Sequence, residues 1–296
     1  MRSKMKVNKL GSSDLNVSEI GLGSWIFGRD YWQNVVDEDS LSVIDAALSK
    51  GINFIDTAPF YGDGHSETIV GKGIASVSRD SVIIATKCGL LKRGTDIVHD
   101  LSSISIEQEL DQSLKRLQTD YVDLYQLHWP DPQVSIEKTM ETLQGLKEQG
   151  LIRHIGLSNH PLGLVERAIK VGPVVSLQDQ YSLLTLKNEQ SLLPYALSQN
   201  MGVIGYGPLH GGLLTGKYRH KPHEPKNSAK NMFYQSNNQE QWTSAKTILE
   251  GLRSKAKQNG TTIANEAIRG VLDKGITTAI IGARNVTQLK GNLGSI

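Results

Sequence analysis

The chain has 296 residues, of which 38% are hydrophobic and 21% charged, the composition of an ordinary globular protein with a sizeable core. Its formal net charge of +2 is too close to zero for a nucleic-acid or anionic-membrane binder, and its single cysteine, Cys88, excludes an internal disulfide. Residues 1–9 lack the apolar core of a secretory signal, and no apolar run approaches the roughly 18 residues of a membrane span. We therefore expect a cytoplasmic protein.

Short apolar segments alternate with longer amphipathic ones along the chain. Strands are predicted at 17–22, 53–56, 81–87, 121–127, 152–157, 174–178, 201–206 and 277–282. Helices are predicted at 39–50, 67–75, 105–117, 136–149, 162–170, 189–199, 244–258, 263–273 and 286–293.

Eight strand–helix units at this length predict an α/β fold, a closed (β/α)8 or TIM barrel whose parallel strands are buried on both faces. The barrel is expected to be a single domain over residues 1–296. Residues 5–16 are predicted to form a short N-terminal hairpin over the bottom of the barrel, with its turn at Gly11 and Ser12.

Polar side chains follow three consecutive predicted strands, which end at Asp56, Lys87 and His128, and Tyr61 lies on the loop after Asp56. The active sites of such barrels lie at these strand ends. Each residue alone has an ordinary structural explanation, as a turn cap, a rim tyrosine, a solvated lysine or a hydrogen-bonded core histidine. Four at one mouth favour a functional site, because such sites gather titratable groups.

The chemistry of this set suits a proton donor aimed at one oxygen atom, as in carbonyl reduction or alcohol oxidation. A tyrosine has a pKa of about 10, and the ammonium of Lys87 is expected to lower the pKa of Tyr61. Asp56 would hold Lys87 charged and oriented, and His128 would hydrogen-bond the same substrate oxygen. No metal site is predicted, because one histidine and one aspartate are too few ligands for a typical metal site.

These four residues stand on the strands, in the order and with the spacing of the catalytic tetrad of the aldo-keto reductases. The surrounding motifs are similar too: Gly21-Leu22-Gly23, Asp56-Thr57-Ala58, Ser66-Glu67, Ala85-Thr86-Lys87 and Asp123-Leu124-Tyr125-Gln126-Leu127-His128. The chain most resembles the bacterial NADP-dependent branch of that family. The resemblance implies hydride transfer to a small carbonyl substrate, with Tyr61 as general acid, Asp56 and Lys87 tuning it, and His128 orienting the carbonyl.

The resemblance also implies a nicotinamide cofactor, NADP, with NAD as the alternative. It places Ser158 and Asn159 on the carboxamide, Gln180 as their third partner, and Tyr206 against the nicotinamide ring. The other implied cofactor contacts are Gly207, Pro208, Leu209, Gly216 and Lys217 at the pyrophosphate, Gly282 and Arg284 at the adenosine phosphate, and Gly23, Gln288 and Asn292.

Two departures from the family pattern bear on these expectations. Many relatives have an arginine where Gln288 stands and a glutamate where Gly291 stands, which keeps the choice between NADP and NAD open. The chain stops at Ile296, where relatives usually continue through a tail that folds over the barrel mouth, so its C-terminal tail is expected to be short.

Trp25, Tyr31 and Trp129 follow the first and fourth strands and are the candidate substrate pocket, whereas Trp32 is assigned to packing. An apolar, aromatic pocket favours aldehydes and hydrophobic ketones over charged sugars.

Two other functions are weighed against the reductase. Residues 211–217 fit the first seven places of a Walker A phosphate loop, but Tyr218 stands where magnesium needs a serine or threonine. A cofactor-binding regulatory or sensor subunit with little turnover would not need the complete tetrad. The polar segment 210–241 is predicted to be a surface loop, and a loop that closes on the cofactor and gates its release is a further hypothesis.

Overall fold

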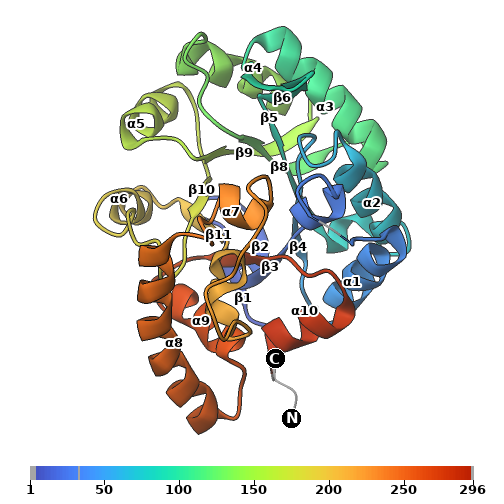
Figure 1. The fold of residues 1–296 in the computed structure, drawn as a ribbon. Helices are drawn as coiled ribbons and strands as arrows, with labels where there is room; N and C mark the ends of the chain where they lie inside the picture. Colours follow the sequence, from blue (N-terminus) through green and yellow to red (C-terminus); the bar gives the residue numbers. More distant parts are fainter. Residues whose placement is uncertain (1–4, 33, 295–296) are drawn as a thin grey trace.

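The computed structural model describes residues 5–32 and 34–294, so both ends of the predicted domain lie outside the described residues. It confirms the barrel: eight parallel strands close in the order β3, β4, β5, β8, β9, β10, β11, β12 and back to β3. Figure 1 shows these strands at the centre and the helices around them. The strands are β3 (Ile20–Gly23), β4 (Phe54–Asp56), β5 (Ile83–Cys88), β8 (Val122–Leu127), β9 (Ile152–Ser158), β10 (Ser176–Gln180), β11 (Gly202–Tyr206) and β12 (Thr278–Ile281).

Apart from the short α7, the helices lie around the outside of the barrel and bury apolar side chains there. Several begin at a side chain that accepts a backbone hydrogen bond, as Ser102 accepts from the amide of Ser105 and Thr262 from that of Asn265. The helices are α1 (Asp37–Ser49), α2 (His65–Ile74), α3 (Ser103–Leu117), α4 (Ile136–Glu148), α5 (Leu162–Val171), α6 (Leu192–Ser198), α7 (Ala229–Met232), α8 (Gln239–Asn259), α9 (Ile263–Leu272) and α10 (Val286–Leu293).

The predicted N-terminal hairpin closes the bottom of the barrel. Its strands β1 (Val7–Lys9) and β2 (Asn16–Ser18) pair antiparallel, and Leu10, Leu15 and Val17 pack against the apolar side chains of the barrel interior. Gly11 has a φ of +58°, and a Cβ there would collide with the carbonyl oxygen of Val175. The hairpin side chains therefore fill the bottom of the barrel interior.

The structure differs most from the predicted elements in three places. The apolar run 17–22 is divided between β2 and β3, because one part pairs with β1 and the other joins the barrel. Residues 90–99 form an unpredicted antiparallel hairpin of β6 (Leu90–Arg93) and β7 (Asp96–His99). The predicted loop 210–241 contains a 3-10 helix at His210–Thr215, then α7 and the start of α8.

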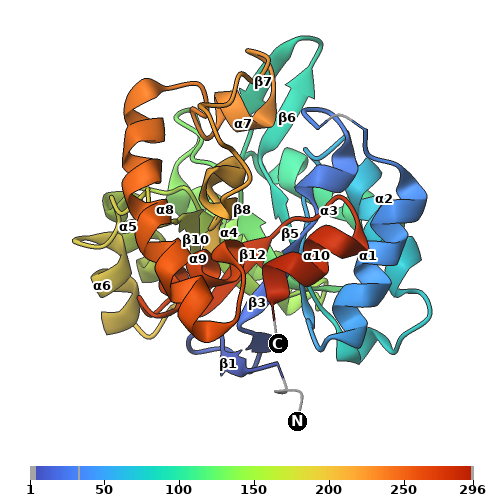
Figure 2. The same ribbon diagram turned by 60° about the horizontal axis from the view of Figure 1, so that its bottom comes forward.

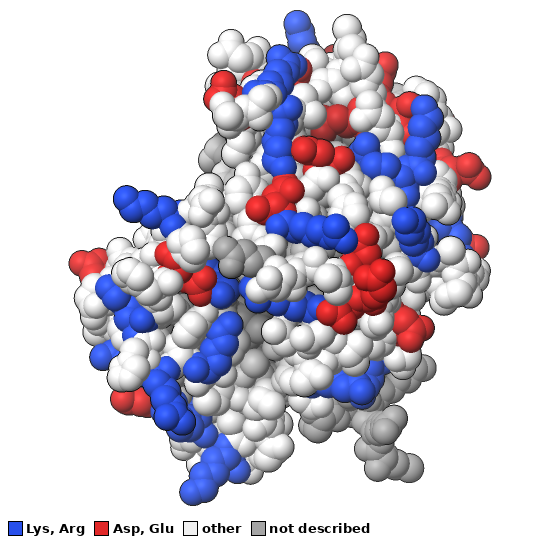
Figure 3. Space-filling model, turned by 45° about the vertical axis from the view of Figure 1, so that its right-hand side comes forward, with Lys and Arg blue, Asp and Glu red and all other residues white. Residues whose placement is uncertain are grey.

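Figure 2 shows that the β6–β7 hairpin and α7 stand at one end of the barrel and β1 at the other. The hairpin and α7 therefore lie at the end of the barrel where the predicted site residues are. On the face drawn in Figure 3, basic and acidic side chains are intermixed. Among the described residues, no helix combines the length and the apolar character that crossing a membrane requires.

Candidate active site

The four predicted catalytic residues meet at the open end of the barrel. The Lys87 Nζ donates to both carboxylate oxygens of Asp56, at 2.6 and 2.5 Å, to the carbonyl oxygen of Thr57 at 3.0 Å, and to the Tyr61 Oη at 3.1 Å. The ring of His128 packs edge-on against the ring of Tyr61, with centroids 5.8 Å apart. Since the ammonium donates to the phenol oxygen, the phenol hydrogen remains available to another acceptor.

Tyr61 is fixed by a close approach of two loops. Gly28, after β3, and Gly62, after β4, pack backbone against backbone, and a Cβ on Gly62 would collide with the Gly28 carbonyl. Gly62 also has a φ of +67°, which favours glycine. Tyr61 is thereby held beside Trp25, with ring centroids 6.1 Å apart.

Burial controls the protonation of this set. It raises the pKa of Asp56 and lowers the pKa of Lys87, and the charge of each partner counteracts the shift of the other. Burial, with the nearby charge of Lys87, lowers the pKa of His128 well below its usual value, so the imidazole is neutral.

The pKa of Tyr61 differs from the expectation that Lys87 lowers it. Burial, followed by the Asp56 carboxylate, raises the pKa of Tyr61 well above its usual value. The phenol is therefore protonated at neutral pH and able to donate a hydrogen bond.

A chain of hydrogen-bonded side chains borders the tetrad on the side of β9, β10 and β11. The Asn159 Nδ2 donates to the Ser158 Oγ and to the carbonyl oxygen of His128, both at 3.0 Å, and its Oδ1 accepts from the Tyr206 Oη at 2.9 Å. The Gln178 Nε2 donates to the Asp56 Oδ1 at 3.0 Å.

The sequence analysis expected Gln180 in this group, but the structure lines the cavity with Gln178. Gln178 is buried, lines the cavity and accepts from the Ser158 Oγ at 3.5 Å, whereas Gln180 lies at the end of β10 and does not line the cavity. The two glutamines of Gln178-Asp179-Gln180 point to the same face of the strand, so the sequence alone did not distinguish them.

The tetrad opens into a cavity of about 770 Å³. Most predicted site residues line it: Gly23, Trp25, Asp56, Tyr61, His128, Trp129, Ser158, Asn159, Tyr206, Gly207, Pro208, Leu209, Lys217, Gly282, Arg284, Gln288 and Asn292. Lys87 lies behind this lining, fully buried beside Asp56. Tyr31 and Gly216 do not line the cavity: Tyr31 packs behind Trp25 and Phe233, and Gly216 packs against Ile263.

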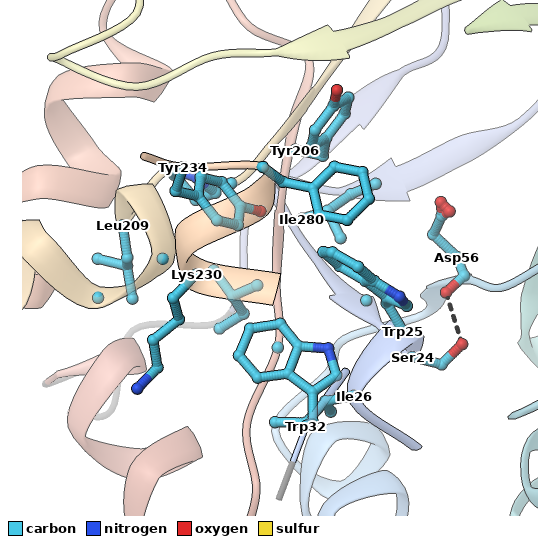
Figure 4. A pocket seen from close by; sticks show the side chains of 18 of the residues that line it. Ser24, Trp25, Ile26, Trp32, Asp56, Tyr206, Leu209, Lys230, Tyr234 and Ile280 are labelled. Carbon is cyan, nitrogen blue, oxygen red and sulfur yellow. Dashed lines mark hydrogen bonds between the residues drawn. The ribbon is translucent and has the colours of Figure 1, made fainter. Parts of the chain in front are cut away.

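One end of the cavity is lined by three cationic side chains, Lys217, Lys230 and Arg284. Burial and the charges of Lys230 and Arg284 lower the pKa of Lys217. Within the described residues, Lys230 is paired with Glu224 at 2.7 Å. Figure 4 shows Lys230 and Asp56 at opposite sides of the pocket, with the rings of Trp25 and Trp32 between them. The cavity therefore joins a cationic end to the tetrad.

Several lining residues were missed in the sequence. Trp32, which was assigned to packing, lines the cavity, stands edge-on to Trp25 with centroids 5.4 Å apart, and lies under the Arg284 guanidinium. Phe233 and Tyr234 come from the predicted surface loop, where two adjacent aromatic residues in a polar segment were the available signal.

The β6–β7 hairpin contributes Leu90, Ile97 and His99 to the lining. Gly94-Thr95 between two short β-prone runs was its signal. The polar residues that flank this turn obscured the alternation of a typical strand.

Comparison with known proteins agrees with this geometry. The sequence model of the Aldo/keto reductase family matches residues 19–296. Aldo-keto reductase YhdN of Bacillus subtilis is 38% identical over 297 residues, which cover 97% of this chain and 87% of that relative. The NADH-specific methylglyoxal reductase of Escherichia coli is 37% identical over 227 residues, which cover 72% of this chain and 70% of that protein.

Two solved structures are also similar. The glycerol dehydrogenase AKR11B4 of Gluconobacter oxydans has a TM-score of 0.89 and 33% identity, over 98% of this chain and 90% of that one. The holo form of an aldo-keto reductase from Bacillus halodurans has a TM-score of 0.79 and 29% identity, over the same shares. With a family match over nearly its whole length, the chain belongs to the aldo/keto reductase family, oxidoreductases that reduce aldehydes and ketones with NAD(P)H.

Proposed function

We propose that the protein is an NADPH-preferring carbonyl reductase in which Tyr61 donates the proton to the substrate oxygen. One observation carries this proposal: the Lys87 Nζ bridges the Asp56 carboxylate and the Tyr61 Oη at the floor of the cavity. In this proposal residues 1–296 form one barrel domain that carries the whole site.

The lining of the cavity fits a nicotinamide dinucleotide. The amide and hydroxyl groups of Ser158, Asn159 and Gln178 offer donors and acceptors for a carboxamide, and the Tyr206 ring lies beside them. Lys217 and Arg284 offer positive charge for phosphates at the other end. When bound, the cofactor supplies the hydride that reduces the carbonyl carbon.

The tetrad divides the work of placing one proton. Tyr61 is protonated and gives its hydrogen to the carbonyl oxygen, and the neutral His128 donates a hydrogen bond that orients that oxygen. Lys87 stabilises the phenolate that remains, because its ammonium lies 3.1 Å from the Tyr61 Oη. Asp56 keeps Lys87 in position without contacting the substrate oxygen.

Three cations at one end of the cavity support a preference for NADPH over NADH. Lys217, Lys230 and Arg284 together carry more charge than Glu224, the carboxylate that pairs with Lys230. Gln288 adds no charge, and its Oε1 accepts from the Arg284 amide at 2.9 Å, which helps to fix the start of that segment. Because one similar protein is named an NADH-specific reductase, both cofactors belong in the test.

The two alternative functions are weaker. Gly211 and Gly212 line the same cavity as the tetrad, which supports a role for residues 211–217 at the cofactor phosphates rather than in a separate nucleotide site. A cofactor-binding subunit with little turnover would not need a lysine that contacts both Asp56 and Tyr61.

The test is NADPH oxidation with nitrobenzaldehyde, a reactive aromatic aldehyde, by the wild type and Tyr61→Phe, with NADH in parallel. We expect Tyr61→Phe to lower kcat by about 10²–10⁴-fold while NADPH still quenches tryptophan fluorescence. Arg284→Ala should weaken the binding of NADPH more than the binding of NADH. Binding of NADPH without turnover of any carbonyl by the wild type would instead favour the regulatory subunit.

A further inference from the structure

His99 stands in the wall of the cavity on the substrate side, outside the tetrad and outside the cofactor contacts proposed above. It ends β7, and together with Ile97 it lines the cavity near His128 and Trp129. It lies close enough to His128 to contribute, after burial and Lys87, to the lowered pKa of His128. The β6–β7 hairpin therefore brings a polar group to the place where the far end of a substrate would lie.

The tautomer of His99 is fixed by its protein partner. The Nδ1 lies 2.7 Å from the carbonyl oxygen of Pro130, and a carbonyl oxygen only accepts, so Nδ1 carries a hydrogen and donates it. Within the described residues, Nε2 has no hydrogen-bond partner. The second ring nitrogen is thus free to bind a substrate group.

The hairpin that carries His99 is held in place by contacts of Lys92 with two neighbouring loops. Lys92, on β6, forms an ion pair with Asp30, lies 3.5 Å from Asp63, and its ammonium sits 5.2 Å from the centre of the Phe60 ring. The register pairs His99 with Leu90. Because the hairpin is anchored to the loops after β3 and β4, the imidazole is preorganised rather than swinging on a free loop.

Trp25, Trp129, Ile97 and Phe233 also line the cavity and present largely apolar surface to it. Tyr61 and His128 are engaged by the carbonyl oxygen in the proposed function. A polar group elsewhere on the substrate would therefore be desolvated against these rings unless it reached His99.

We propose that His99 is a specificity-determining residue that binds a hydroxyl group of the substrate, so that the site selects small, uncharged hydroxy-aldehydes and hydroxy-ketones. The proposal rests on the proposed reductase function and names its substrate class. In the neutral ring Nε2 accepts a hydrogen bond, and in the imidazolium it donates one. A hydroxyl satisfies either form, whereas a carboxylate pairs only with the imidazolium.

The test compares two matched pairs of substrates, lactaldehyde with propanal and hydroxyacetone with acetone, each pair differing by one hydroxyl. His99→Asn keeps a donor near Pro130 but removes the group at the Nε2 position, and His99→Gln reaches that position again. We expect His99→Asn to raise KM for the hydroxylated member about tenfold with little change in kcat, and to leave propanal and acetone unchanged. His99→Gln should recover part of the loss.

A second measurement needs no turnover. In titrations followed by tryptophan fluorescence, propylene glycol should bind the NADPH-loaded wild type with a lower dissociation constant than propanol does. His99→Asn should remove this difference. Equal losses on both members of each pair, or preferential use of glyoxylate at low pH, would overturn the role of His99. If the wild type reduces none of these carbonyls, the proposed function fails instead, and the glycol titration still decides whether His99 binds a hydroxyl.

Discussion

Two buried carboxylates near the active-site lysine differ in what they contact. Glu67 accepts from the Thr86 Oγ1 at 2.6 Å and from the Arg116 Nε at 2.7 Å, so both of its oxygens are bonded. Glu109 accepts from the amide of Gly89 at 2.8 Å, but its Oε2 is buried without a hydrogen-bond partner in the described part of the chain. Burial raises the pKa of Glu109 to about 8, so this side chain is a neutral acid in the folded protein.

Glu109 therefore makes the stability of the protein depend on pH. The unfolded chain loses this proton near pH 4.5 and the folded protein near pH 8, so its contribution to stability falls by about 1.4 kcal/mol per pH unit between these values. We expect Glu109→Gln to remove that fall. Urea unfolding at several pH values measures it, and a difference between variant and wild type that stays constant with pH would contradict the assignment.

His128 gives a second pH prediction, this time for activity. Because its pKa lies well below the usual value, the imidazole stays neutral as the pH falls through about 6.5. The rate of carbonyl reduction should show no inflection from His128 near pH 6.5, where an ordinary histidine titrates. An inflection near pH 6.5 that disappears in His128→Gln would show that the imidazole is protonated after all. The control is that the wild type stays folded over the same pH range.

At the scale of the elements, the sequence predicts best where a local signal and the burial pattern agree. Residues 286–293 were predicted as a helix and α10 has these bounds, since Asn285 supplies an N-cap before a regular apolar stripe. The start of α8 was missed because its first turn is polar, although Asn238 caps it by accepting from the amides of Glu240 and Gln241. The four residues of the tetrad could be predicted because the carboxyl ends of parallel barrel strands lie at the same mouth. Trp32 and Phe233 could not, because they lie on loops whose sequences show no regular apolar pattern.

Two adjacent asparagines before α8 have different structural roles, one in holding a loop together and one in capping the helix. Asn237 accepts from the amide of Glu224 at 2.8 Å and donates to its carbonyl oxygen at 2.7 Å, which ties residues 224–237 into one loop beside Lys230 and Tyr234. Asn237→Ala should loosen this loop and raise the dissociation rate of NADPH, measured by stopped-flow fluorescence. Asn238→Ala, which removes a helix cap, is the control: it should cost about 1 kcal/mol of stability and leave that rate unchanged. Equal rates in both variants and the wild type would exclude gating by this loop.

At the scale of the whole molecule, the barrel separates a structural end from a chemical end. Asp123 lies near the start of β8, and His128 directly follows the end of this strand, roughly 16 Å further along. Asp123 is buried and accepts from the Arg79 Nη2 at 2.6 Å, the amide of Ile84 at 2.9 Å and the Arg153 Nη1 at 3.3 Å. These contacts tie β5, β8 and β9 together at the bottom, away from the cavity.

Removing this carboxylate should therefore affect folding without affecting chemistry. Asp123→Ala leaves the buried amide of Ile84 without its acceptor and removes the carboxylate from Arg79, whose guanidinium keeps three other acceptors. We therefore expect a loss of about 1–3 kcal/mol in the free energy of unfolding. The folded fraction should keep its kcat and KM for nitrobenzaldehyde, because the tetrad is built at the opposite ends of the strands. The matched control is Lys115→Ala, which breaks an exposed ion pair with Asp111 and should change stability by less than about 1 kcal/mol. A fall in kcat for folded Asp123→Ala would mean that strain at the bottom reaches the tetrad, and the two ends of the barrel would then be coupled through β8.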